Sequence, residues 1–252
     1  MNHLNRLCAT VLVAAGLLAS RTQAKAQEPG SQSGQSFEKQ ITKTLSMKYL
    51  LYMPKDYGKE AAKKWPLMLF LHGSGESGTD VEKVKVHGPP KLVAAGKEFP
   101  FILVSPQSPG GGWNTETLNA LLDDIIKKYS VDEDRVYLTG LSMGGYGTWD
   151  LAMAYPDRFA AIAPICGGGT SWKSRRIKHI PTWIFHGAKD PTVPVRNGQE
   201  MYDAMKAAGA DVKITIYPEA GHDSWTETYN NPDLYTWFLD HKRQPRTAEV
   251  KK

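Results

Sequence analysis

The chain has very little cysteine, with only Cys8 and Cys166 among 252 residues. Cys8 lies in an apolar N-terminal run that we interpret as part of a cleaved leader, which leaves one cysteine. A single cysteine excludes an intrachain disulfide framework and the paired thiolates of most structural zinc sites. Stability must therefore come from a packed core. Cys166 follows the apolar run 160–165 and is predicted to be a small buried side chain rather than a reactive thiol.

Clustered metal ligands and a phosphate-binding loop are also missing from the sequence. The histidines are scattered, so we expect no metal site. The glycine runs 110–112 and 167–169 lack the G-x-G-x-x-G spacing of a dinucleotide site, and no glycine-rich loop leads into a helix with a lysine. We therefore expect no cofactor.

An excess of positive over negative charge is found mainly at the two ends of the chain. The formal net charge is +5, and removal of a leader that carries Arg6, Arg21 and Lys25 lowers it to about +2 (5 − 3). The remaining surplus lies in the C-terminal segment 244–252 and just before it, which we interpret as a flexible basic tail. No nucleic-acid partner is expected.

Long hydrophobic runs are limited to residues 7–19, which are too few to span a bilayer comfortably. The small residues Ala24 and Ala26 after this run fit a signal-peptidase site, so residues 1–26 are predicted to be a signal peptide. Secretion to the periplasm or the outside follows, with no membrane attachment after cleavage. Residues 27–36 are predicted to be a polar linker, and residues 37–243 a single domain without repeats.

Alternating strand-like and helix-like patterns fill the predicted domain. Residues 66–71 and 99–104 are apolar runs of strand length, as expected of strands covered on both faces. Between residues 114 and 129, apolar side chains recur at helical spacing. This alternation predicts a mostly parallel sheet flanked by helices. Further strands are predicted at 135–139, 160–165, 182–185 and 212–217, further helices at 195–209 and 233–241, and an antiparallel hairpin at 37–54.

A G-x-S-x-G motif, Gly140 to Gly144, stands between a predicted strand and a predicted helix. A serine hydroxyl becomes an effective nucleophile when a sharp turn presents it to a base and to backbone N–H groups. The flanking glycines permit such a turn without side chains that would block it. The context therefore predicts that Ser142 is a catalytic nucleophile.

Two further predicted strands are each followed by a partner for such a serine. Asp190 comes after the strand at 182–185, and His222 after the strand at 212–217. The carboxyl ends of parallel strands meet at one edge of a sheet, so Ser142, Asp190 and His222 can converge there. Asp223 is the fallback acid, but its adjacency to His222 makes the geometry poor. His72 and His186 are interpreted as supports, and His87 as lying near the mouth of the site.

These motifs make the chain similar to secreted serine esterases of the α/β-hydrolase superfamily. Within it, the chain resembles the group that joins feruloyl and acetyl-xylan esterases, polyhydroxybutyrate-depolymerase-like esterases and peptidases related to the prolyl oligopeptidase catalytic domain. The resemblance implies an α/β-hydrolase fold with a Ser-His-Asp site, and it covers most of the chain after residue 65. The matching stretches are 71–76, 87–90, 140–149, 187–194 and 221–225.

An oxyanion hole requires two backbone donors aimed at the developing negative charge. The N–H of Met143, directly after the nucleophile, is the first. By resemblance, the second is the N–H of Ser74, with Gly73 as the next choice.

The segment between the strands at 160–165 and 182–185 is too short for a packed helical cap, so we expect no sizeable cap domain and an open site. Trp113, Trp172 and Trp225 each follow a strand end and are predicted substrate contacts for an aryl acid or a sugar ring, with ordinary packing as the alternative. The remaining tryptophans, Trp65, Trp149, Trp183 and Trp237, are predicted to pack in the core.

Together these features predict a secreted carboxylic-ester hydrolase that acts on acyl or feruloyl esters, either small molecules or groups carried by plant polysaccharide. Two alternatives remain open. One is a serine peptidase of the prolyl-oligopeptidase type, which uses the same triad. The other is a noncatalytic carbohydrate-binding protein on a hydrolase scaffold. The oligomeric state is left open as well, because fold analogy does not settle it.

Overall fold

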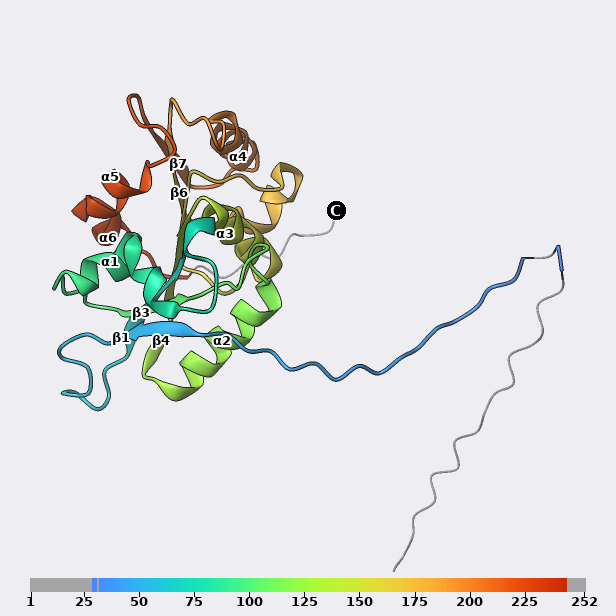
Figure 1. Cartoon of the computed structure of the whole chain (residues 1–252), viewed down its shortest axis with the longest axis horizontal. Helices are drawn as coiled ribbons and strands as arrows, with labels where there is room; N and C mark the ends of the chain where they lie inside the picture. The colour runs from blue at the N-terminus through green and yellow to red at the C-terminus, as the bar shows by residue number, and fades with distance from the viewer. Residues whose placement is uncertain (1–28, 31, 244–252) are drawn as a thin grey trace, which may run out of the picture. The chain divides into compact units, whose positions relative to one another are not determined.

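The computed structural model describes residues 29–30 and 32–243 (Figure 1). The chain divides into two units, Met1–Lys43 and Thr44–Lys252. The described part of the first unit contains no helix or strand, and the side chains of Phe37 and Ile41 in it are exposed. The predicted signal peptide at 1–26 and the predicted tail at 244–252 lie outside the described residues, and the predicted boundaries at 27–36 and 37–243 stay predictions.

The second unit is built on a seven-stranded sheet with the order β1-β3-β2-β4-β5-β6-β7. Strand β1 runs antiparallel to β3, and every other neighbouring pair is parallel. The mostly parallel sheet predicted from the sequence is therefore confirmed. The strands are β1 (Tyr49–Tyr52), β2 (Trp65–Leu71), β3 (Ile102–Pro106), β4 (Val131–Leu141), β5 (Ala161–Ile165), β6 (Thr182–Gly187) and β7 (Val212–Tyr217).

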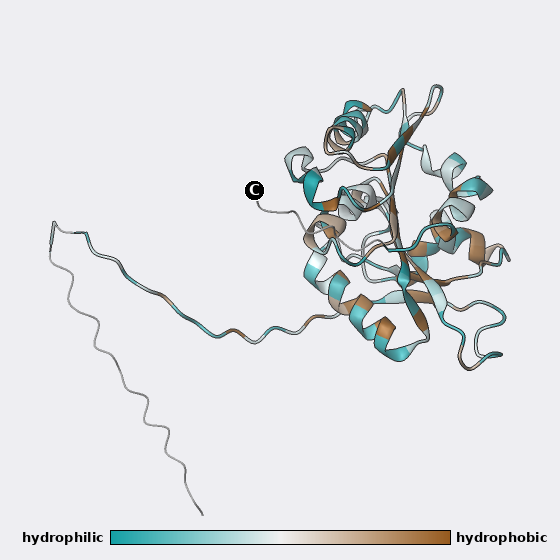
Figure 2. Ribbon diagram, turned by 180° about the vertical axis from the view of Figure 1, so that it is seen from behind, coloured by the Kyte–Doolittle hydropathy of each residue, from teal (hydrophilic) through white to brown (hydrophobic). Residues whose placement is uncertain are grey.

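The middle of the sheet is covered on both faces, which explains why its strands are apolar without alternation. Every residue of β2 and β5 is buried. Figure 2 shows hydrophobic colour along the central strands and hydrophilic colour on the outer sides of the helices. Trp65 and Trp149 are buried, and Trp183 and Trp237 are partly buried against each other, with ring centroids 5.5 Å apart.

Two helical layers sandwich the sheet (Figure 1). One layer packs its apolar side chains with β2, β4 and β5 in one core, and the other forms a second core on the opposite face. The first layer holds α2 (Thr115–Lys128), α3 (Met143–Ala154), α4 (Arg196–Ala207) and the 3-10 helix η3 (Ser171–Ile177). The second layer holds α1 (Gly88–Ala94), α5 (Trp225–Asn230), α6 (Pro232–Leu239) and the 3-10 helix η2 (Val81–Val86). A further 3-10 helix, η1 (Ser74–Glu76), follows β2.

Helix α2 illustrates how the local sequence produces these layers. Asn114 begins the helix, and its side chain accepts a hydrogen bond of 2.8 Å from the amide of Thr117. Leu118, Leu122 and Ile125 lie on one face and are fully buried against the sheet. Burial of each such side chain contributes about 1.5–3 kcal/mol, so packing rather than intrinsic propensity fixes this helix in place.

Two expectations about the connections have different outcomes. The antiparallel hairpin predicted at 37–54 is wrong: β1 is a single edge strand whose antiparallel partner is β3, far along the chain. Between β5 and β6 the chain forms only the short helix η3, so the expectation of no sizeable cap is confirmed.

Among residues 29–30 and 32–243, no helix has the length and apolar character needed to cross a membrane.

Candidate active site

Ser142 lies in a strained turn between β4 and α3, with φ 52° and ψ −115°. A non-glycine residue adopts a positive φ only where its surroundings impose it. A Cβ atom on Gly144 would lie 2.0 Å from the carbonyl oxygen of Leu71, and one on Gly140 would lie 2.4 Å from that of Gly144. The flanking glycines are thus required because backbone segments approach closely here, and they hold Ser142 at the carboxyl edge of the sheet.

A chain of hydrogen bonds joins the serine, histidine and aspartate that the sequence singles out. Nε2 of His222 lies 2.9 Å from Oγ of Ser142, and Nδ1 lies 2.8 Å from Oδ2 of Asp190. In the neutral imidazole, one nitrogen donates and the other accepts. A proton on Nδ1 satisfies the carboxylate and leaves Nε2 free to accept the serine proton.

The loop after β6 fixes the carboxylate of Asp190. Oδ1 accepts hydrogen bonds of 2.9 Å from the amides of both Thr192 and Val193. Burial raises the pKa of Asp190, but the hydrogen bonds from His222 and from these amides outweigh burial, so the pKa lies below its ordinary value. The carboxylate therefore stays ionised beside the histidine at neutral pH.

Two other histidines near the site are locked in the neutral form. Nε2 of His72 accepts the amide hydrogen of Ser108 at 3.0 Å. Nε2 of His186 lies 2.8 Å from the carbonyl oxygen of Val193, to which it donates. Burial lowers the pKa of both imidazoles. Both histidines hold loops in place, as the sequence interpretation expected, and neither lies within hydrogen-bond distance of Ser142 Oγ.

The backbone amides predicted to form an oxyanion hole belong to Met143 and to Ser74 in the loop after β2. Met143 is the first residue of α3, so its N–H belongs to the unpaired amides of a helix N-terminus. The N–H of Gly73 donates to Oε2 of Glu76 at 3.0 Å. That bond uses the amide of Gly73, whereas the next residue, Ser74, is exposed.

The three tryptophans predicted as substrate contacts have different surroundings. Trp113 is half-buried and donates its indole N–H to the carbonyl of His72 at 3.3 Å. Trp172 is 78% exposed, with the ammonium of Lys173 5.0 Å from its ring centroid. Trp225 stands edge to face with His222, at 5.2 Å between centroids and 89° between planes. The structure therefore brings only Trp225 into contact with a residue of the hydrogen-bond chain.

The fallback acid Asp223 has another role. Its carboxylate caps α5 through hydrogen bonds of 3.0 and 2.9 Å to the amide and hydroxyl of Thr226. Asp190, not Asp223, occupies Nδ1 of His222.

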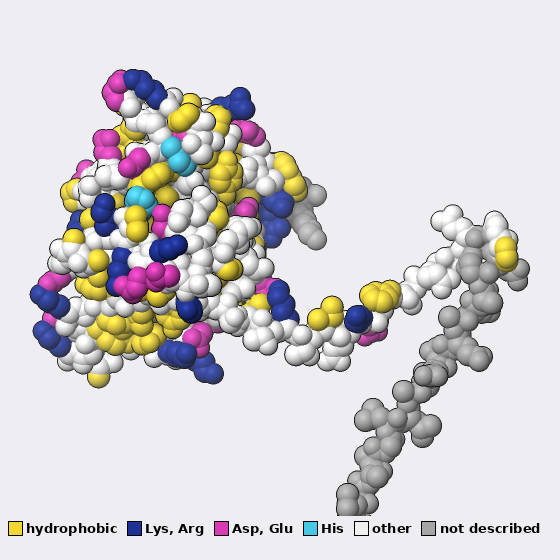
Figure 3. All heavy atoms as spheres, viewed as in Figure 1, with side chains coloured by type: hydrophobic (Ala, Val, Ile, Leu, Met, Phe, Trp, Pro, Cys, Tyr) yellow, Lys and Arg dark blue, Asp and Glu magenta, His cyan; other side chains and the backbone are white. Residues whose placement is uncertain are grey.

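The buried carboxylate of Glu76 lies beside His87 and Trp225; the sequence interpretation placed His87 near the mouth of the site and assigned no role to Glu76. Oε1 of Glu76 lies 3.7 Å from Nε2 of His87, whose Nδ1 accepts the indole N–H of Trp225 at 3.3 Å. On the face shown in Figure 3, histidine atoms reach the surface in two places. Glu76 also accepts the N–H of Gly73, three positions earlier, but glycine is not the serine or threonine of the usual capping signature, so the sequence carried no clear signal for this contact.

Three potential metal ligands lie within 4.8 Å of one another: the thiol of Cys166, the carboxylate of Asp190 and the imidazole of His222. Burial raises the pKa of the Cys166 thiol to about 12. A metal ligand must be a thiolate, so this donor set is poorly suited to a zinc ion, and the aspartate and histidine are already hydrogen-bonded to each other. As predicted, Cys166 is buried.

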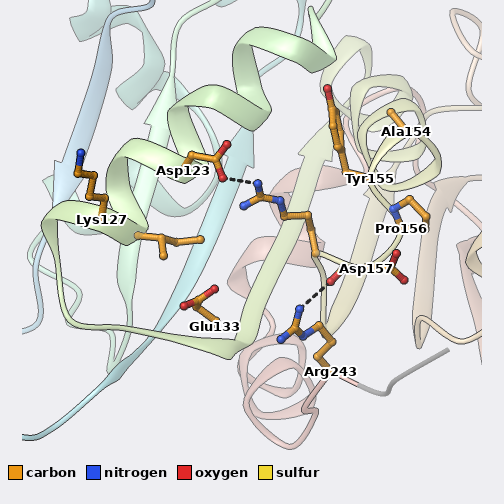
Figure 4. A pocket seen from close by; sticks show the side chains of 10 residues that line it. Asp123, Lys127, Glu133, Ala154, Tyr155, Pro156, Asp157 and Arg243 are labelled. Atoms are coloured by element: carbon orange, nitrogen blue, oxygen red, sulfur yellow. Dashed lines mark hydrogen bonds and ion pairs between the residues drawn. The ribbon is translucent and has the colours of Figure 1, made fainter.

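A cavity of about 500 Å³ lies at the far end of α3 from Ser142 (Figure 4). Both arginines that line it have partners: Arg158 pairs with Asp123, and Arg243 donates to the backbone carbonyl oxygen of Asp157 at 2.9 Å. None of the predicted site residues lines this cavity. The chemistry is therefore expected at the carboxyl edge of the sheet.

Comparisons with known proteins indicate the family and the class of enzyme. Residues 113–238 of the 252 match the Dienelactone hydrolase family. The chain is 27% identical over 207 residues to a probable feruloyl esterase C of Aspergillus terreus, covering 80% of this chain and 74% of that protein. It is 28% identical over 188 residues to a bifunctional acetylxylan esterase/xylanase of Neocallimastix patriciarum, covering 68% of this chain and 26% of that protein.

Among solved structures, a thermostable esterase is 35% identical, with a TM-score of 0.67. The match covers 77% of this chain and 59% of the esterase chain, so the likeness concerns the α/β unit rather than the whole of that protein. The protein belongs to the dienelactone hydrolase family and is a carboxylic-ester hydrolase with the α/β-hydrolase fold.

Proposed function

We propose that the protein is a serine esterase in which Ser142 is the nucleophile, His222 the general base and acid, and Asp190 the residue that orients the imidazole. The observation that carries the proposal is the continuous chain of hydrogen bonds from Asp190 through His222 to Ser142 Oγ, at 2.8 and 2.9 Å. Such a chain is the arrangement that activates a serine hydroxyl for acyl transfer.

The first half of the reaction forms an acyl-enzyme. Oγ of Ser142 attacks the ester carbonyl carbon as Nε2 of His222 takes the hydroxyl proton. Asp190 stabilises the resulting imidazolium, in keeping with its lowered pKa. The carbonyl oxygen becomes an oxyanion, and the amides of Met143 and Ser74 donate to it. One such donor contributes on the order of 3 kcal/mol of barrier lowering. Collapse expels the alcohol, which takes the proton from Nε2.

The second half uses the same groups for water. Nε2 of His222 accepts a proton from a water molecule, whose oxygen attacks the acyl carbonyl. The second tetrahedral intermediate collapses, Ser142 Oγ recovers the proton from His222, and the carboxylic acid leaves.

We further propose that the ester is an acyl or feruloyl group, carried by a small molecule or by a plant polysaccharide. Two observations support a bulky ester. The short connection through η3 leaves no sizeable cap over the site. The relatives include proteins named for feruloyl and acetylxylan ester cleavage. Aromatic rings such as that of Trp225 suit aryl and sugar rings.

Secretion is part of the proposal. Its support is the sequence pattern of residues 1–26, a short apolar run followed by small residues.

The experiment that tests this function compares residues 27–252 with their Ser142→Ala variant. The substrates are p-nitrophenyl acetate, butyrate and laurate, methyl ferulate, acetylated xylan and a chromogenic prolyl peptide. We expect ester cleavage by the wild type that disappears in the variant. Cleavage of the peptide alone would replace the esterase with a peptidase. Ester cleavage that survives in the variant would contradict the assignment of Ser142.

A further inference from the structure

Glu76 is a buried acid that faces two histidines. It is 7% exposed, at the end of η1 in the loop after β2. Among the described residues, the basic side chains within 4.0 Å of its carboxylate are those of His72 and His87, at 4.0 and 3.7 Å. Burial of a carboxylate without hydrogen-bond donors costs free energy, so the groups that contact this carboxylate indicate its role.

The first donor is the backbone N–H of Gly73, 3.0 Å from Oε2. Gly73 has φ −80° and ψ −178°, and a Cβ atom there would lie 2.7 Å from Cδ1 of Leu141. A larger residue would require the end of this leucine side chain to shift, and glycine is the residue with the least intrinsic backbone restriction. The peptide plane between Gly73 and Ser74 carries the proposed second oxyanion donor, and the direction of that N–H depends on ψ of Gly73. The bond to Glu76 restrains this otherwise permissive residue.

The second neighbour of the carboxylate is His87, at 3.7 Å, which is longer than a hydrogen bond, and the tautomer of His87 follows from Trp225. The indole N–H of Trp225 can only donate, so Nδ1 of His87 accepts it at 3.3 Å. The imidazole proton is then on Nε2, which faces Oε1 of Glu76 at 3.7 Å. His72 cannot take this place, because its Nε2 accepts from Ser108 and its Nδ1 lies 2.5 Å from the carbonyl oxygen of Gly73.

Trp225 connects this group to the proposed general base. Its ring lies 5.3 Å from that of His87 and 5.2 Å from that of His222, measured between centroids. The carboxylate of Glu76 thus contacts Gly73, in the loop of the proposed oxyanion hole, on one side. On the other side it is connected to His222 through the rings of His87 and Trp225.

We propose that Glu76 is a positioning residue of the esterase: it fixes the Ser74 N–H through Gly73 and fixes the ring of Trp225 beside His222 through His87. This proposal rests on the function proposed above. Glu76 contacts no reacting atom, so its effect is expected in the transition state, where the oxyanion exists, rather than in substrate binding.

The experiment compares Glu76→Ala and Glu76→Gln with a matched control, Glu82→Gln. Glu82 is an exposed acid on the neighbouring helix η2, where it pairs with Lys85 at 2.5 Å. The readouts are kcat and KM with p-nitrophenyl acetate, the affinity for an aryl trifluoromethyl ketone, which forms a tetrahedral oxyanion on the serine, and the melting temperature.

We expect Glu76→Ala to lower kcat by about 10²-fold, the usual effect of one lost oxyanion donor, with KM changed by less than about threefold. The ketone should lose affinity by a similar factor. Glu76→Gln retains an oxygen that accepts from Gly73 and should recover most of kcat. If Glu76→Ala matched Glu82→Gln in kcat and ketone affinity while only its melting temperature fell, Glu76 would be a structural cap and the proposal would be wrong.

A measurement without turnover keeps the proposal testable if Glu76→Ala does not fold. The ¹⁵N signals of His87 are assigned by comparison with a His87→Gln variant. In spectra of the wild type at pH 8, the imidazole of His87 should be the neutral Nε2–H tautomer. Trp225→Phe should abolish this preference. An Nδ1–H tautomer in the wild type would overturn the arrangement. These spectra do not depend on ester cleavage, so failure of the proposed function, seen as hydrolysis that survives Ser142→Ala, remains distinguishable.

Discussion

Two carboxylate–histidine pairs border the same indole, and they differ in what occupies the far nitrogen of the imidazole. In the pair of Asp190 and His222, the nitrogens are 2.8 Å from the carboxylate and 2.9 Å from Ser142 Oγ. In the pair of Glu76 and His87, the nitrogen that faces away from the carboxylate accepts the N–H of Trp225. A carboxylate beside a histidine does not by itself make a base: the accepting nitrogen must face an ionisable hydroxyl rather than a fixed donor.

Of the variants that test this comparison, Ser142→Ala is expected to lower kcat the most. Removal of the hydroxyl leaves His222 with no proton to take, and kcat for p-nitrophenyl acetate should fall by about 10⁵-fold or more. Ser171→Ala serves as the control, because that hydroxyl only donates to Glu200 at 2.7 Å on the surface. Comparable activity in the two variants would mean that another residue is the nucleophile.

The next effect separates the two neighbouring acids. Asp190→Asn should lower kcat by about 10⁴-fold, because the amide no longer holds the proton on Nδ1 of His222. Asp223→Asn keeps a side-chain oxygen that accepts from the amide of Thr226 at the start of α5, so both stability and kcat should be nearly unchanged. Steady-state kinetics and urea unfolding of both variants check this, and a larger loss of kcat in Asp223→Asn would reverse the assignment.

A smaller effect measures the coupling between the two pairs. Trp225→Phe keeps a ring beside His222 but deletes the N–H that His87 accepts, and a lost hydrogen bond of about 1 kcal/mol would lower kcat about fivefold. Trp183→Phe is the matched control, because its N–H donates to Thr215 at 2.9 Å in the second core. Equal kcat values for the two variants would show that the pairs act independently.

The smallest effect is one of pH on stability. The folded-state pKa of Asp190 is below its ordinary value, since hydrogen bonds outweigh burial. Its stabilising contribution is therefore present above about pH 4, the ordinary carboxyl pKa, and is lost as pH falls through the lower folded pKa. Urea unfolding from pH 7 to pH 2.5 should show wild type and Asp190→Asn converging at acid pH. A constant difference would contradict the shift.

The sequence was sufficient to predict the parallel sheet, because buried strands such as β2 are apolar throughout and α2 carries a clear helical period. It was also sufficient to nominate Ser142, Asp190 and His222, since each follows a strand at the same edge. The hairpin at 37–54 failed because β1 pairs with β3, a long-range partner that local alternation does not reveal. The roles of Glu76 and His87 depend on contacts with Gly73 and Trp225, which no spacing in the chain specifies.

The most direct measurement of the central claim is the site of covalent labelling by a fluorophosphonate ester probe. Intact mass spectrometry and peptide mapping of the wild type and of Ser142→Ala would locate the adduct. We predict one adduct per chain, on Ser142, formed in parallel with the loss of esterase activity and absent from the variant. Labelling of a different residue together with loss of activity, or full activity after Ser142 is labelled, would contradict the account.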